Sequence, residues 1–161
     1  MVRINFINSL PPQKTTLTDT VIYKYISKYS KGDTIIGDYK MSCIIRPNGD
    51  FLPVKYYGDS IAYVNEDTEL SMDVYYKDSV ILSTILARKR FQEYLDFPDD
   101  NFQNYALYTV TDFRVERDTF KMEISVNIPD TDLFYLFELS IANNGKLLIR
   151  DITPEDGEDC F

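Results

Sequence analysis

Residues 119–128, TFKMEISVNI, decide the fold of this chain. Every second residue is apolar, from Phe120 to Ile128, and the residues between them are polar or charged. Successive side chains of a β-strand point to opposite faces, so this segment predicts a strand with one buried and one wet face. Such alternation is typical of antiparallel sheets, whereas the strands of parallel sheets are usually covered on both faces.

Three further alternating segments surround this strand, over residues 105–116, 133–142 and 146–152. The connections between the four segments are only two to four residues long. Links this short join antiparallel neighbours, so the C-terminal half predicts a four-stranded meander. The segment 133–142 is apolar on its odd positions and, through Phe134 and Leu136, partly on its even ones. We expect it to be a central strand, or to be covered on both faces at one end.

The N-terminal half also predicts mainly strands. Apolar residues alternate from Ile35 through Tyr39, Met41, Cys43 and Ile45, and Pro-Asn-Gly-Asp at 47–50 predicts a turn. Shorter strands are expected at 54–57 and 60–64, and longer ones at 70–76 and 80–87 around a turn at 77–79. Residues 88–95 predict a short helix. The segment 15–29 has apolar residues at helical spacing, which favours a helix, although its β-branched residues and tyrosines also suit a strand.

These segments predict a mainly β protein with about eight antiparallel strands in a meander and one or two short helices. The strands form either a sandwich or a small barrel, and polarity alone does not distinguish the two. We divide the chain into a leader over 1–14, ordered or disordered, a single mainly β domain over 15–152, and an acidic tail over 153–161. A chain of 161 residues is long enough to bury a core without disulfides or metals.

The composition argues against catalysis, because the chain contains no histidine. Triads and dyads that use histidine are thereby excluded, and so are imidazole metal ligands. Glu123 and Glu138 are expected on facing strands, and they form a carboxylate pair that could act as the two catalytic groups of a glycosidase. An exposed cross-strand position is the simpler interpretation of Glu123. We therefore predict a protein that is not an enzyme and that has no cofactor and no metal.

The two cysteines do not predict a disulfide framework. Cys43 falls on the apolar side of its strand, where a thiol behaves as a small hydrophobe, and Cys160 lies in the acidic tail.

The net charge of −9 is unevenly distributed. Residues 1–60 contain eight basic and five acidic side chains, whereas residues 61–161 contain nine and twenty-one. Such an acidic body repels the phosphate backbone, so we expect no nucleic-acid partner. No stretch of the sequence reaches the ~20 apolar residues of a transmembrane helix.

Tyrosine is the most suggestive residue type, with thirteen copies and no tryptophan. Exposed tyrosines are good contact groups for a protein or a sugar, although the ring also suits the rim of a β-sheet core. The candidate interaction face consists of Tyr56, Tyr57, Asp73, Tyr75, Tyr105 and Tyr108.

The pieces IIRPNGDFLPVKYY, DVYYKDSVILSTILARKRFQEYLDF and DTFKMEISVNIPDTDLFYLFELSIANNGKLLIRDI resemble a family of small uncharacterised lipoproteins of Bacteroidetes-type bacteria. The resemblance covers roughly residues 33–152. It implies export and a lipid-anchored N-terminus on the cell envelope, and it transfers no functional residue. Neither a lipobox cysteine nor an apolar leader precedes Pro11. We therefore expect an envelope protein if the resemblance holds and a cytoplasmic one if Met1 is the true start.

Taken together, these features predict a non-enzymatic binding module of the bacterial cell envelope that recognises a protein or a small apolar ligand. The alternative is an acidic inhibitor or immunity-type protein that masks a basic site on its target, with Asp99, Asp100 and Asp112 as contact residues.

Overall fold

The computed structural model describes residues 7–9, 13–14, 21–27, 30–57 and 61–155, which contain twelve strands, one α-helix and one 3-10 helix. Mainly β structure with very little helix is therefore confirmed. The strands are β1 (Ile7–Ser9), β2 (Gln13–Lys14), β3 (Val21–Ser27), β4 (Ser30–Ile36), β5 (Tyr39–Phe51), β6 (Lys55–Tyr57), β7 (Ile61–Tyr76), β8 (Ser79–Ala87), β9 (Ala106–Glu116), β10 (Thr119–Asn127), β11 (Phe134–Ala142) and β12 (Leu147–Asp151). The helix α1 spans Arg88–Gln92, and the 3-10 helix spans Phe102–Asn104.

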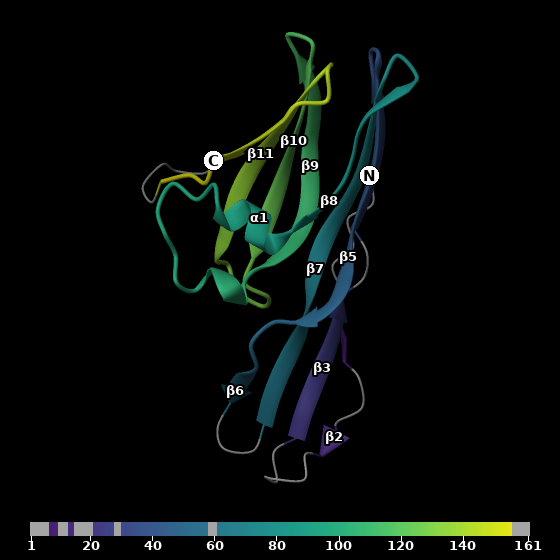
Figure 1. Ribbon diagram of the computed structural model, residues 1–161. Helices are drawn as coiled ribbons and strands as arrows, with labels where there is room; N and C mark the ends of the chain where they lie inside the picture. Colours follow the sequence, from purple (N-terminus) through teal and green to yellow (C-terminus); the bar gives the residue numbers. More distant parts are fainter. Residues whose placement is uncertain (1–6, 10–12, 15–20, 28–29, 58–60, 156–161) are drawn as a thin grey trace.

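The described strands form two sheets that pack face to face, as in a sandwich (Figure 1). The larger sheet has eight strands around the order β1-β3-β7-β5-β4, and β2, β6 and β8 pair at its sides. The smaller sheet has the order β12-β11-β10-β9. Among the strands that the structure describes, β3 and β7 pair in parallel, and the other neighbours are antiparallel.

The smaller sheet confirms the predicted C-terminal meander. Its four strands begin and end within one or two residues of the expected bounds, and consecutive strands are neighbours. On β10, the side chains of Phe120, Met122, Ile124 and Val126 are fully buried, whereas the residues between them face outward. The strand β11 is central, as its mixed polarity predicts.

The long strand β7 replaces two strands that the sequence predicts separately. It runs without interruption through Asn65, Glu66, Asp67, Thr68 and Glu69, although this polar run resembles a loop. The reason is that β5 pairs with this part of β7 as far as Glu66. In addition, the buried Asp67 forms an ion pair with Arg88, and the Thr68 hydroxyl donates to the carbonyl of Leu107. The part of β7 that precedes this run extends beyond the smaller sheet, beside β3 and β6 (Figure 1).

The predicted helix over 15–29 is wrong for residues 21–27, which form β3; the rest of that segment lies outside the described residues. The strand pairs in parallel with β7 and antiparallel with β1. Sheet pairing on both sides therefore prevails over the helical spacing, in agreement with the β-branched residues and tyrosines of the segment.

Two details of the predicted strand at 35–46 also need correction. The chain reverses at Gly37 and Asp38 between β4 and β5, so Ile35 pairs with Lys40 and is exposed rather than buried. The predicted turn at 47–50 does not reverse the chain. Instead, β5 continues to Phe51, and its pairing with β7 shifts register between Pro47 and Phe51. The Asn48 side chain accepts a hydrogen bond from the backbone N–H of Asp50 within this irregularity.

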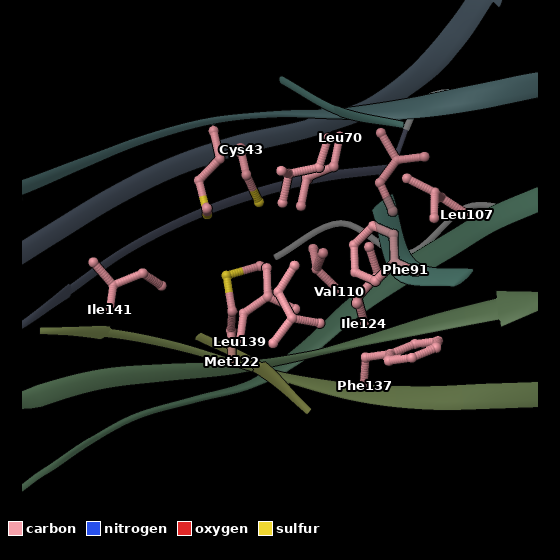
Figure 2. Packing of buried hydrophobic residues seen from close by; sticks show 14 of the residues in the cluster. Cys43, Leu70, Phe91, Leu107, Val110, Met122, Ile124, Phe137, Leu139 and Ile141 are labelled. Carbon is pink, nitrogen blue, oxygen red and sulfur yellow. The ribbon is translucent and has the colours of Figure 1, made fainter. Parts of the chain in front are cut away.

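The core lies between the sheets, where side chains of both meet in a single cluster (Figure 2). Cys43 belongs to it, as predicted, and burial raises the pKa of its thiol to about 12. The helix α1 begins where the predicted helix begins and ends earlier. It buries Phe91, whose ring packs against that of Phe137, 5.2 Å away between ring centres.

Candidate functional site

A pocket of about 270 Å³ opens at one end of the sandwich, where the loop after β10 approaches β5 and β7. This is the end beyond which β7 continues past the smaller sheet (Figure 1). Fourteen residues line it: Ile45, Arg46, Pro47, Glu66, Thr68, Ala106, Leu107, Tyr108, Asn127, Ile128, Pro129, Asp130, Thr131 and Asp132. The lining thus combines six apolar residues with four charged residues and four that carry a hydroxyl or an amide group.

Hydrogen bonds shape the loop that forms one wall of the pocket. The backbone N–H of Ile128 donates to the carbonyl of Leu133 at 3.1 Å, and the Thr131 hydroxyl donates to the carbonyl of Ile128 at 2.9 Å. Asp130 adopts a left-handed conformation with φ of 62°, which aspartate tolerates better than most residues. The loop is therefore held in a defined conformation.

The opposite side of the pocket connects the two sheets. The hydroxyl of Thr68 on β7 donates to the carbonyl of Leu107 on β9 at 2.8 Å, and both residues are buried. Arg46 on β5 forms an ion pair with Glu69 on β7 at 3.2 Å. Because each sheet contributes residues, the pocket exists only in the assembled sandwich.

A lysine ammonium reaches the pocket loop from β6. The Nζ of Lys55 donates to the carbonyl of Pro129 at 3.1 Å. Burial lowers the pKa of Lys55, and the neighbouring Asp130 opposes this by favouring the charged form. The loop thus already contacts one primary amine of the chain itself.

Comparison with known families assigns the chain to a family. The sequence profile of DUF4738, a domain of unknown function, matches residues 14–149. This chain belongs to the DUF4738 family. The match covers β3 through β11, and hence all fourteen residues of the pocket. It agrees with the resemblance to an uncharacterised family. A search of curated proteins found no significant match.

The structure of this DUF4738 chain does not gather the predicted tyrosine face into one surface. Tyr108 lines the pocket and is 43% exposed, whereas Tyr56 on β6 is 71% exposed and is not part of the lining. Tyr105 is only 6% exposed and stacks on Phe102 in the core, so its ring is not available to a partner.

The remaining members of the predicted face lie elsewhere. Asp73 and Tyr75 are near the other end of β7, where Asp73 accepts a hydrogen bond from Ser83 and the Lys40 ammonium lies over the Tyr75 ring. The side chain of Tyr57 lies outside the described residues. Of the five predicted residues whose side chains the structure describes, Tyr108 alone lines the pocket. The other residues of the pocket were not predicted from the sequence. The acidic segment Asp130-Thr131-Asp132 is the sequence feature that could have indicated them.

The carboxylate pair Glu123 and Glu138 lies on facing positions of β10 and β11, as predicted. Glu138 is 5% exposed and accepts hydrogen bonds from Arg114 and Arg150, and the ammonium of Lys121 lies 3.5 Å from its Oε1. Burial, followed by hydrogen bonding with Asp112, raises the pKa of Glu123. Each carboxylate therefore belongs to an ion-pair network on the outer face of the smaller sheet, which accounts for their proximity without catalysis.

The three aspartates expected as contact residues of an inhibitor-type protein have different surroundings. Asp112 pairs with Arg114, and Asp99 accepts a hydrogen bond from the Tyr135 hydroxyl at 2.8 Å, whereas Asp100 is exposed. Within the described part of the chain, no three cysteine or carboxylate side chains gather where they could hold a metal ion. The same residues include no helix long and apolar enough to span a bilayer.

Proposed function

We propose that this DUF4738 domain is a non-enzymatic binding module that takes a small, largely apolar ligand into the pocket between its two sheets. The observation that carries the proposal is the pocket itself, with Ile45, Leu107 and Ile128 among its apolar lining and Tyr108 at its exposed side. Burial of an alkyl group against such walls contributes about 0.8 kcal/mol per methylene. The Glu123–Glu138 pair offers no competing site, because both carboxylates are engaged in ion pairs.

Titration with 1-hexanol, followed by two-dimensional amide NMR, tests this proposal. We expect saturable shifts of the amides of Thr68, Leu107 and Asp130, with a dissociation constant in roughly the millimolar range for so small a probe. Tyr108→Ala should weaken binding about three- to tenfold, because the variant removes part of the pocket wall.

Tyr56→Ala is the matched control, since Tyr56 is a more exposed tyrosine that does not line the pocket. It should leave the dissociation constant unchanged. Shifts that do not saturate, or that Tyr56→Ala reduces as strongly as Tyr108→Ala, would argue for a tyrosine surface that binds a macromolecule instead.

We further propose, from the resemblance to envelope lipoproteins, that the module acts at the bacterial cell envelope. Antibody detection in fractions of the bacterium that makes the protein tests this location. Recovery with the envelope supports it, and recovery with the cytoplasm overturns it.

A further inference from the structure

The strand β8, Ser79–Ala87, forms an edge of the larger sheet and, among the described strands, pairs with β7 alone (Figure 1). Its sequence, SVILSTILA, contains no charged residue and no proline. Natural edge strands usually carry such residues, because an open edge otherwise pairs with another chain. The register shift opposite Tyr75 and the contact of Gly145 with the carbonyl of Ile81 protect the first part of this edge. Residues 82–87 form its open part.

The backbone of this part of β8 has free hydrogen-bonding groups. The N–H of Lys77 donates to the carbonyl of Asp38 at 2.9 Å. Because hydrogen-bonded positions alternate along an antiparallel pair, the odd-numbered residues of this part of β7 bond to β5 and the even-numbered residues bond to β8. The even-numbered residues face three residues of β8: Leu82, Thr84 and Leu86. The N–H and C=O groups of Ser83 and Ile85 therefore point away from β7, and the described residues supply no hydrogen bond to them.

A second copy of this chain matches these groups. When two β8 strands pair antiparallel about a two-fold axis at Thr84, Ser83 of each copy lies opposite Ile85 of the other. These residues then exchange N–H···O=C bonds on both sides of the axis, and the groups that point away from β7 are satisfied. The Ile85 side chains, 56% exposed on the outer face of the sheet, become diagonal neighbours. No like charges meet within the paired strands, since β8 has none.

The residues that flank β8 favour a second copy over an unrelated strand. Asp78 precedes the strand and Lys89 follows it; both are exposed, and neither forms an ion pair within the described part of the chain. Arg88 and Arg90, by contrast, have acidic partners in the chain itself. Antiparallel pairing places the start of one strand beside the end of the other, which brings Asp78 of each copy towards Lys89 of the other. This charge complementarity occurs on both sides of the axis.

We infer that β8 is the surface through which two copies of this chain associate, by antiparallel pairing of residues 82–87 that continues the larger sheet from one copy into the other. No residue of β8 lines the pocket, so this interface goes beyond the proposed function and its test is independent of it.

Sedimentation velocity of the full chain at pH 7, over a series of concentrations, tests the association. Pairing through one strand buries less than the ~1,600 Å² of a typical stable interface, so we expect a monomer–dimer equilibrium with a dissociation constant of roughly 10–300 µM. A monomer at every concentration up to about 1 mM overturns the inference.

Ile85→Lys should weaken the dimer at least ~tenfold, because it places two ammonium groups close to the axis. The matched control is Ile35→Lys, which makes the same change at a 74% exposed isoleucine of β4, on the opposite side of β5 and β7 in this sheet. It should leave the dissociation constant within about twofold. Equal weakening by both variants, or no weakening by Ile85→Lys, overturns the inference.

Amide hydrogen exchange of the wild type, followed by NMR, locates the interface without relying on the folding of a variant. The amide of Thr84, which bonds to β7, should be protected at low and at high concentration. The amides of Ser83 and Ile85 should exchange rapidly in the monomer and at least ~tenfold more slowly where most of the chain is dimeric. If their exchange rates stay unchanged while the chain dimerises, the copies associate through another surface and the inference is overturned.

Discussion

At the scale of single residues, Glu138 shows how this chain accommodates a charge in a nearly buried position. Two arginines donate to its carboxylate, and Lys121 adds a third positive charge. A buried charge without such partners would be strongly destabilising. The neighbouring Glu123 differs, because burial and Asp112 raise its pKa while Arg114 acts in the opposite direction. In this cross-strand pair, cationic partners therefore stabilise the charge of Glu138, whereas burial and Asp112 disfavour the charged form of Glu123.

The raised pKa of Glu123 predicts a pH-dependent effect on stability. Because the folded state holds this proton more tightly than the unfolded state, the associated stabilisation is present below the ordinary pKa of 4.5 and is lost as pH rises through the folded pKa. Glu123→Gln cannot ionise, so it should be more stable than the wild type at pH 7, by up to ~1 kcal/mol. The difference should shrink towards pH 4. Urea unfolding at both pH values measures it, and a difference independent of pH would contradict the assignment.

The predicted tyrosine residues show what sequence resolves at this scale and what it does not. Val110 is buried, so strict alternation would bury Tyr108 and expose Leu107, whereas Leu107 is buried and Tyr108 is exposed. The pairing of β9 with β10 shifts register between Ser125 and Val126, so simple alternation does not hold there. Exposure of an individual tyrosine depends on such irregularities, which the polarity of the sequence does not reveal.

At the scale of the elements, β10 allows a direct test of the register. Ile124→Ala should lower the free energy of unfolding by about 2–5 kcal/mol, because the side chain is fully buried between the sheets. Glu123→Ala, one residue earlier and on the opposite face, should cost less than ~0.5 kcal/mol. Urea unfolding of both variants at pH 7 measures the two values. Equal effects would mean that the strand is shifted by one residue.

The elements that the sequence predicts correctly are those whose partners are close in the chain. The strands β9 to β12 are joined by short turns, so alternation and turn residues suffice to predict their order. The continuity of β7 is different, because its buried Asp67 pairs with Arg88 at 3.3 Å and Thr68 bonds to Leu107. The parallel pairing of β3 with β7 likewise joins segments far apart in sequence. Such distant partners leave no local pattern, and the pocket depends on them.

At the scale of the whole molecule, specific contacts join the two sheets and thereby maintain the pocket between them. The hydroxyl of Tyr39 on β5 donates to the carbonyl of Asp118 in the turn between β9 and β10. Arg88 connects Asp67 on β7 to the carbonyl of Phe102. At the turn between β11 and β12, Gly145 lies against Ile81 of β8. The sandwich is thus joined at several places along its edges and its ends.

The contact of Gly145 yields a prediction about this joining of the sheets. A Cβ at this position would lie 2.0 Å from the carbonyl oxygen of Ile81, so Gly145→Ala must displace the turn from β8. Gly37→Ala is the matched control, because Gly37 also has a positive φ, 58° against 85°, but has open space around it. The control should cost about 1–2 kcal/mol from backbone strain alone. Gly145→Ala should cost at least ~1 kcal/mol more, through steric overlap with a packed backbone. Thermal unfolding of the two variants measures the difference, and equal losses would mean that β8 and this turn do not contact each other in solution.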